Sequence, residues 1–373
     1  MDKRKFIKTL GIGSAAMAVS PMLFSGCSSS FEKQPVKNWM WIHSPDNSSP
    51  DELKARLDNA RNHGIDAVFM ETSIGETPAS ESEWQPLSHP TLEKLIQAGK
   101  DTGVEVHCWL WQMPNNIPAI AEKHGDWFAV NGLGEPAHTH PAYVGYYKFM
   151  CPNHPEVREY LRLRVKSAGA LEGLAGVHLD YIRLPDVILA EALQPNYNIV
   201  QDREYPQYDY CYCERCRAMF KDKTGIDPLT GLDDPSASPE WRQFRYDSVT
   251  GLVNGVLAPE ARKSDKMITA AVFPNWESVR QEWRNWELDA YFPMLYHNFY
   301  NAGIEWIGEH IRMHIDQLRI KKPVYSGLFL PSLDPEELRE AYSVSIEAGA
   351  AGVSLFGSIS DEHFKVLKEM RSL

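Results

Sequence analysis

The stretch LAGVHLDYIRL, residues 174–184, has the length and the apolar content of a buried β-strand. A helical period over residues 155–171 precedes it, and a segment rich in proline and tyrosine follows it. The same alternation, an apolar run of strand length and then a helical period, recurs along residues 38–373. The fold can therefore be predicted by following this alternation outward in both directions.

Eight strands are predicted in this way, at residues 39–43, 65–72, 104–113, 174–184, 267–273, 288–296, 324–330 and 352–356. A helix is expected after each strand. Ser49 before Pro50 and Asp334 before Pro335 are clear helix starts, each with an N-cap residue and a proline in the first helical position. Eight such units in one chain of this size predict a (β/α)8 TIM barrel. A doubly wound sheet would need fewer strands and a phosphate-binding loop, and we find no such loop in the sequence.

The predicted barrel domain covers residues 38–373 and carries one long insertion after strand four, at about residues 185–239. This insertion is rich in proline, tyrosine and aspartate, and it contains three cysteines. No interdomain linker and no tandem repeat other than the strand–helix period is evident.

The composition is that of a globular protein, with 43% hydrophobic, 24% charged and 11% aromatic residues. The formal net charge is −12 at pH 7. Because an acidic surface repels phosphate backbones and anionic lipid headgroups, nucleic acid is not an expected partner. The aromatic residues suit a large core, and they also suit a cleft that binds a flat ligand such as a sugar.

Residues 1–26 have the features of an export signal: a basic beginning and then a short stretch of apolar and small residues. This stretch is shorter and richer in glycine, alanine and serine than a membrane-spanning helix, which is the alternative interpretation. Leu23–Cys27 resembles the lipobox of bacterial lipoproteins, in which the signal is cut before a cysteine that becomes lipidated. By this resemblance Cys27 is the lipid-anchored first residue and residues 27–37 are its tether. The predicted location is outside the cytoplasm, anchored to a membrane at the periplasm or the cell surface.

In a (β/α)8 barrel the active site lies at the carboxyl ends of the strands. Asp180 lies late in strand four, where a buried charge is costly unless it is paired or functional. Arg183 is expected to lower the pKa of Asp180 and keep it ionised, as a nucleophile or as an electrostatic stabiliser. Glu71, at the end of strand two, and Glu277, just after strand five, are the candidates for the acid/base. The alternatives are a structural Asp180–Arg183 pair and a solvated Glu277 near a helix start.

Aromatic and polar residues at the same strand ends predict a carbohydrate-binding rim, because aromatic faces stack on sugar rings and polar groups bond the hydroxyls. The candidate substrate-binding residues are His43, Trp109, Trp111, Arg183, Trp276, Tyr296 and His297.

No catalytic metal and no cofactor is predicted, because the histidines of the rim lack the spacing of metal ligands. Cys211, Cys213 and Cys216 form a dense cluster in the insertion. They are compatible with a structural zinc that takes a fourth ligand from elsewhere, with a disulfide that could involve Cys151, or with free thiols. A structural staple is favoured over catalysis, since no base for a cysteine nucleophile is evident.

Three segments resemble the glycosyl-hydrolase-like 10 family of bacterial glycosidases. They are Gly176–Pro185, Asp289–Tyr296, and Cys211–Phe220 together with Thr224–Pro228. The resemblance implies a TIM barrel, an exported location and carbohydrate substrates, and it matches Asp180 to the acid of strand four in that family. Many retaining barrel glycosidases carry a second acid after strand seven. Here no acid follows strand seven before Asp334.

The predicted function is a glycoside hydrolase that acts on an oligo- or polysaccharide at the cell envelope with carboxylate chemistry. Two alternatives remain open at this point. One is a glycan-binding surface lipoprotein on a catalytically inactive barrel, and the other is a metal-dependent lyase or isomerase.

Overall fold

The computed structural model describes residues 36–45, 47–72 and 89–371, which belong to one compact unit. The predicted signal peptide, Cys27 and most of the tether at 27–37 lie outside the described residues. No helix in the described part of the chain is long and apolar enough to cross a membrane.

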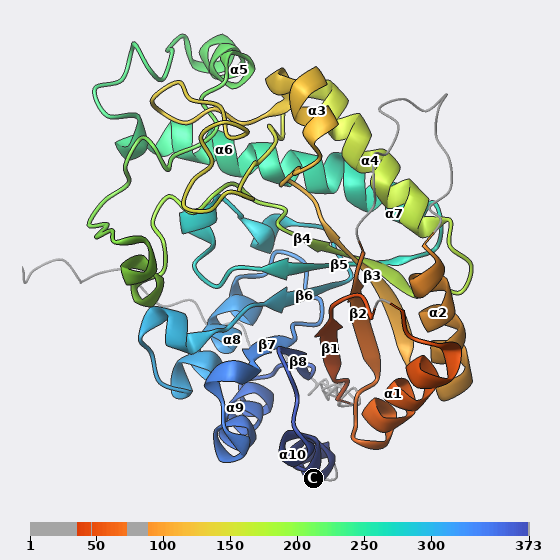
Figure 1. Cartoon of the computed structure of the whole chain (residues 1–373). Helices are drawn as coiled ribbons and strands as arrows, with labels where there is room; N and C mark the ends of the chain where they lie inside the picture. Colours follow the sequence, from red (N-terminus) through yellow and green to blue (C-terminus); the bar gives the residue numbers. More distant parts are fainter. Residues whose placement is uncertain (1–35, 46, 73–88, 372–373) are drawn as a thin grey trace, which may run out of the picture. The chain divides into compact units, whose positions relative to one another are not determined.

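Eight parallel strands form one sheet in the order β6-β5-β4-β3-β2-β1-β8-β7. They are β1 Trp39–Ile42, β2 Ala67–Glu71, β3 Glu105–Trp111, β4 Gly176–Asp180, β5 Met267–Val272, β6 Ala290–Pro293, β7 Ser326–Phe329 and β8 Val353–Phe356. Two isolated parallel bridges, Tyr291 with Val324 and Met294 with Gly327, join the β6 edge to the β7 edge. The sheet is therefore a nearly closed barrel, and the predicted (β/α)8 fold is confirmed (Figure 1).

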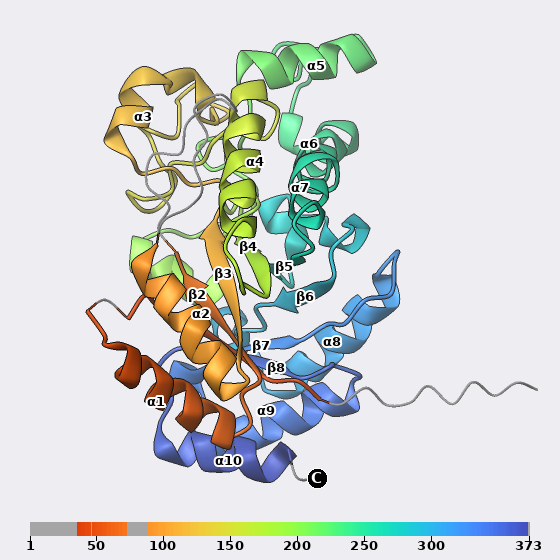
Figure 2. The ribbon, with the colours of Figure 1, turned by 90° about the vertical axis from the view of Figure 1, so that its right-hand side faces the viewer.

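Helices cover the outside of this barrel (Figure 2). They are α1 Pro50–Asn62, α2 Pro90–Thr102, α4 Pro155–Gly169, α6 Pro239–Leu252, α7 Ala258–Arg262, α8 Glu305–Gln317, α9 Pro335–Glu347 and α10 Asp361–Arg371. Two more helices, α3 Pro118–Lys123 and α5 Glu214–Thr224, lie in the long connections at the carboxyl side of the strands (Figure 2). The two predicted helix starts are confirmed. Ser49 and Asp334 each form a capping box with the glutamate three residues later.

One expected helix is wrong. Residues 273–289 between β5 and β6 contain only two 3-10 turns, Trp276–Val279 and Trp283–Asn285. Trp276, Trp283 and Trp286 are buried in this connection and belong to the main apolar core. Bulky indole rings thus cover this part of the barrel in place of a helix.

Inward-pointing aromatic rings fill the barrel interior below its mouth. Trp39 stacks on Phe69, and Phe69 stacks on His178 with 3.8 Å between the ring centroids. His178 bonds Trp41 and Thr269 through its two ring nitrogens, and burial keeps its pKa well below the usual value. This histidine is a neutral, satisfied residue of the core.

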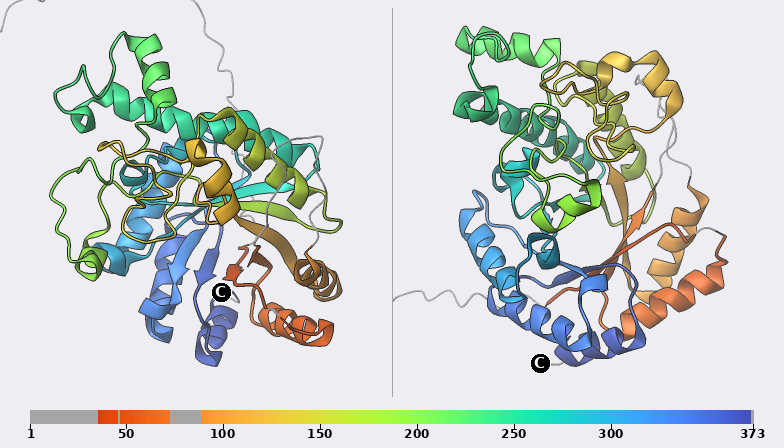
Figure 3. Two further views of the ribbon diagram at one scale, coloured as in Figure 1. Left: turned by 45° about the horizontal axis from the view of Figure 1, so that its top comes forward. Right: turned by 60° about the vertical axis from the view of Figure 1, so that its left-hand side comes forward.

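Two long segments on the carboxyl side of the strands pack on each other, residues 112–154 between β3 and α4 and residues 181–238 between β4 and α6 (Figure 3). They share a second apolar cluster, to which the first segment contributes Ala137 and Cys151, the second Tyr210 and Phe220, and α6 Trp241. The second segment is also tied to the barrel by the buried Asp209, which accepts hydrogen bonds from Arg245 of α6 and from Arg280 after β5. The second segment, which contains the predicted insertion, is thus packed against the barrel beside its mouth.

Candidate active site

Asp180 is the last residue of β4, and its side chain points into the mouth of the barrel. It is 7% exposed. Its Oδ2 accepts a hydrogen bond from the indole N–H of Trp109 at 2.9 Å, and its Oδ1 accepts one from the backbone N–H of Tyr181 at 2.6 Å. Tyr181 has a φ of 49°, a left-handed conformation that a bulky residue seldom adopts. Such strained backbone is often found at functional sites.

The electrostatics of Asp180 differ from the sequence-based expectation. Arg183 does not bond Asp180; its guanidinium bonds Oδ2 of Asp186 at 3.0 Å and the hydroxyl of Tyr147 at 3.2 Å. Burial is the main cause that raises the pKa of Asp180, and the charge of Glu71 adds to it, while two hydrogen bonds and the charge of Arg183 lower it; the resulting pKa is about 6. The charge of Arg183 lowers this pKa as expected, but desolvation outweighs it, so the expectation that the pKa of Asp180 is lowered overall is wrong. A carboxyl with a pKa near 6 is suited to donating a proton.

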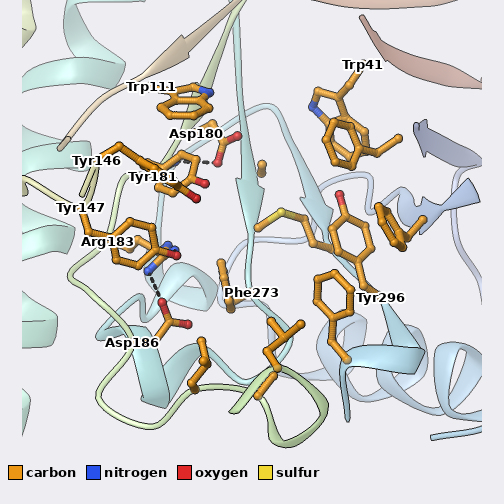
Figure 4. Close-up of a pocket in the computed structure, with 18 of the residues that line it drawn as sticks. Trp41, Trp111, Tyr146, Tyr147, Asp180, Tyr181, Arg183, Asp186, Phe273 and Tyr296 are labelled. Carbon is orange, nitrogen blue, oxygen red and sulfur yellow. Dashed lines mark hydrogen bonds and ion pairs between the residues drawn. The ribbon is translucent and has the colours of Figure 1, made fainter. Parts of the chain in front are cut away.

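Asp180 lies at the wall of a pocket of about 290 Å³. Figure 4 shows Trp111, Tyr181 and Tyr147 on the Asp180 side and Trp41 and Tyr296 across from them. The lining is mainly aromatic, and it is formed by Trp41, His43, Trp109, Trp111, Tyr146, Tyr147, Asp180, Tyr181, Arg183, Asp186, Leu189, Ala190, Leu193, Tyr197, Ala271, Phe273, Met294, Tyr296, Phe299, Tyr300, Phe329 and Phe356. An aromatic pocket with a few converging polar groups is the usual form of a small-ligand site.

Glu71 is the last residue of β2, next to Trp109 of β3 in the sheet register. Its Oε2 lies 2.5 Å from Nδ1 of His43, which itself lines the pocket. Its side chain is 27% exposed. Asp180 and Glu71 thus lie on the two strands that flank β3, at the barrel mouth. The negative charge of Glu71 contributes to the raised pKa of Asp180.

The structure brings most of the predicted rim residues to this pocket: His43, Trp109, Trp111, Arg183 and Tyr296 all line it. Four predicted site residues, Glu71, Trp276, Glu277 and His297, are not among the lining residues. Of these four, Glu71 is paired with His43, which does line the pocket. Trp276 is buried against Tyr246 in the connection that replaces the expected helix, and Glu277 beside it is exposed.

The sequence did not predict that residues of the two long segments would line one side of the pocket. Tyr146 and Tyr147 come from the first segment, and Asp186 and Tyr197 come from the second. Neither segment shows a strand or helix period, so the sequence did not reveal which way these side chains point. The run of tyrosines at residues 143–147 was the available signal.

The described residues contain one group that could hold a metal, and none of its members lines the pocket. It consists of Cys151, Cys211, Cys213 and Cys216, which we call the cysteine cluster. Their four sulfur atoms all lie within 4.8 Å of one another. Cys151 joins the three cysteines of the insertion from the other long segment.

With the site described, the chain can be compared with known proteins. No protein-family model and no curated protein matches it. Solved structures do match. The catalytic domain of a β-amylase from Paenibacillus polymyxa superimposes with a TM-score of 0.63 and 10% identity, covering 91% of this chain and 98% of that one.

A β-galactosidase from Halorubrum lacusprofundi gives a TM-score of 0.64 with 12% identity, and the match covers 90% of this chain and 58% of that one. An endo-1,4-β-mannanase from Rhizomucor miehei gives 0.53 with 9% identity, covering 90% and 95%. These glycoside hydrolases share the barrel. At this identity the likeness establishes the fold, and the chemistry has to be argued from the pocket.

Proposed function

We propose that this protein is a glycoside hydrolase, related to the glycosyl-hydrolase-like 10 family by its sequence segments. The observation that carries the proposal is the buried Asp180 carboxyl at the end of β4, facing an aromatic pocket in a barrel that glycoside hydrolases share. Aromatic rings supply stacking faces for a sugar ring, and a carboxyl whose pKa is raised to about 6 supplies the proton that a leaving glycosidic oxygen needs in weakly acidic solution.

Asp180 acts as the proton donor in this proposal, and Glu71 as the second carboxylate, held by His43. Glycoside cleavage requires two carboxyl groups roughly 5–10 Å apart. Strands β2 and β4 are separated by one strand, so their backbones lie on the order of 10 Å apart. Glu71 pairs with His43 of the pocket lining, and Asp180 lines the pocket itself. The proposal requires that the two carboxyls come within the range of roughly 5–10 Å. The roles are reversed relative to those expected from the sequence, because Asp180 has the raised pKa.

The pocket favours a small substrate. Its volume of about 290 Å³ lies at the lower end of the roughly 300–1,000 Å³ range of ligand sites. Tyr146, Tyr147 and Tyr197 of the two long segments close one side of it. We therefore propose that it holds the terminal sugar of a chain or a small glycoside.

A second candidate is a glycan-binding protein without activity. The pocket lining favours this candidate in one respect. It contains two carboxyl groups, those of Asp180 and Asp186, and Asp186 is ion-paired with Arg183, so Asp180 is the one lining carboxyl without an ion-pair partner among the described residues. Strand β7 ends at Phe329 without an acid. The same aromatic pocket serves both candidates, and only the enzyme requires Glu71.

The experiment is a screen of the full chain against a panel of aryl glycosides and oligosaccharides, with turnover and binding measured separately. The enzyme is supported if at least one glycoside is cleaved and if Glu71→Gln lowers kcat by 10²-fold or more. Glu277→Gln is the matched control and should retain wild-type turnover. Neither glutamate is a lining residue, but Glu71 is paired with His43 of the lining and contributes to the raised pKa of Asp180, whereas Glu277 is exposed. Binding of a glycan without any turnover would support the binding protein instead.

We also propose that the chain is an exported lipoprotein, on the strength of the lipobox at Leu23–Cys27. Cys27→Ser should abolish labelling with a lipid precursor and release the protein from the membrane fraction. Unchanged labelling in this variant would contradict the proposal.

A further inference from the structure

We propose that the cysteine cluster binds one zinc ion, which fastens the two long segments beside the barrel mouth to each other. Cys151 Sγ lies 3.5 Å from the sulfurs of both Cys213 and Cys216. Four sulfurs bound tetrahedrally to zinc, with bonds of about 2.3 Å, lie about 3.8 Å apart. The observed spread, within 4.8 Å for all four, is close to this arrangement. All four thiols are free in the structure.

The groups around the cluster suit a bound cation with four thiolate ligands. Cys151, Cys211 and Cys216 are buried, and Cys213 is half-buried, so most of the cluster is shielded from water. The side-chain amide of Asn153 donates to Cys216 Sγ at 3.3 Å and to Ser248 Oγ at 2.9 Å. Hydrogen bonds of this kind orient and tune metal ligands.

The cluster also has a route to solvent. Cys213 is half-buried and lines a surface hollow together with Asp126, His154 and Glu214. A zinc ion could enter here after the chain has folded, which is one requirement of a workable metal site. Four protein ligands leave no open position on the metal, so the role is structural and not catalytic.

The position of the cluster explains what the metal would do. Cys151 follows Tyr147 by four residues, and the other three cysteines belong to the segment that carries Asp186 and Tyr197. The zinc would therefore join the two segments that close one side of the pocket. Beyond the metal, a hydrogen bond from the hydroxyl of Tyr143 to the carbonyl of Asp186 at 2.8 Å is one direct link between them.

The test is the metal content of the full chain, purified without chelators and measured by inductively coupled plasma mass spectrometry. We expect about one zinc per chain in the wild type and less than one tenth of that in Cys216→Ser. Cys108→Ala is the matched control, because Cys108 is equally buried but lies in β3 outside the cluster. This control should keep its zinc. Stripping the zinc should also speed proteolytic cleavage within residues 181–238.

A second measurement holds even if Cys216→Ser does not fold. Wild-type protein loaded with Co²⁺ in place of zinc should show the visible absorption of a tetrahedral cobalt–thiolate centre. The proposal is overturned if the wild type contains no zinc and binds neither Zn²⁺ nor Co²⁺. This holds whether mass spectrometry shows the four thiols to be free or paired in disulfides. Iron at one per chain in place of zinc would overturn it as well. None of these readouts depends on glycosidase activity.

Discussion

Replacing Trp109 with phenylalanine tests the proposed role of Asp180 without touching the carboxyl itself. The substitution keeps an aromatic ring but removes the indole N–H that donates to Asp180 Oδ2 at 2.9 Å. A hydrogen bond to a charged group contributes about 1.5–3 kcal/mol. Because one pKa unit corresponds to about 1.4 kcal/mol, the pKa of Asp180 should rise by about 1–2 units. It would move from about 6 to about 7–8.

The sign of the effect on activity follows from the protonation state that the reaction uses. A proton donor must be protonated, so a higher pKa keeps Trp109→Phe active to higher pH and moves the alkaline limb of its kcat/KM profile upward by about one unit or more. An ionised nucleophile would respond differently, with the acid limb moving upward instead. The assay is the pH profile on a glycoside found in the screen.

Trp41→Phe is the matched control. Trp41 also lines the pocket, but its indole N–H donates to His178 and not to Asp180. Its alkaline limb should stay in place. Equal shifts in both variants, or no shift in Trp109→Phe, would refute the reasoning. Carboxyl-carbon NMR titration, with Asp180→Asn to assign the signal, measures the same pKa without any substrate.

Four further variants test stability. Because the pKa of Asp180 is raised in the folded state, its protonated form stabilises the fold below pH 4, and this stabilisation is lost as the pH rises through about 6. Asp180→Asn, which carries no charge at any pH, should therefore be about 1–3 kcal/mol more stable than wild type at pH 7 but not at pH 4. Urea unfolding at the two pH values measures this difference. Gly327→Ala should lower the free energy of unfolding by about 1–3 kcal/mol, because its Cβ would lie 2.7 Å from a carbonyl oxygen of β6 at the barrel seam. Gly251→Ala in α6, with open space around it, should instead gain about 0.5–1 kcal/mol. Asp209→Asn should cost about 3–5 kcal/mol in the same assay, since it leaves the buried Arg245 unpaired; a loss under 1 kcal/mol would contradict this.

The barrel was predictable because its strands and helices have distinct periods. All eight strands lie inside their predicted ranges, and α1 and α9 begin at the predicted prolines, Pro50 and Pro335. The wrong element is the helix between β5 and β6. Tertiary packing decides that connection: Trp283 donates its indole N–H to the carbonyl of Phe273 at 2.9 Å and holds the segment as turns. No local pattern in the sequence reports such a contact.

The pocket was predictable only where it consists of strand ends. His43, Glu71 and Asp180 could be placed at the barrel mouth because the strand period fixes which side chains point inward. Trp276 follows a strand too closely in sequence to be distinguished from a lining residue. Its burial against Tyr246 depends on the turn that the chain makes after β5.

The partners of Arg183 and the fourth cysteine were harder to predict for a related reason. Arg183 lies equally near Asp180 and Asp186 along the chain, and only the folded loop selects Asp186. Cys151 lies 60 residues before Cys211, in a connection whose sequence shows no strand or helix period around it. Burial, which sets the pKa of Asp180, likewise depends on residues from both long segments.

The central claim is that Asp180 donates the proton in glycoside cleavage, and the most direct test is the kcat of Asp180→Asn beside its Kd for the same glycoside. Asparagine has nearly the same shape, so the aromatic pocket should still bind. The account predicts that Kd stays within a few-fold of the wild-type value and that kcat falls by at least 10²–10⁴-fold. This fall corresponds to an increase of about 3–5 kcal/mol in the activation free energy. A folded Asp180→Asn protein that turns over the glycoside at the wild-type rate would contradict the account.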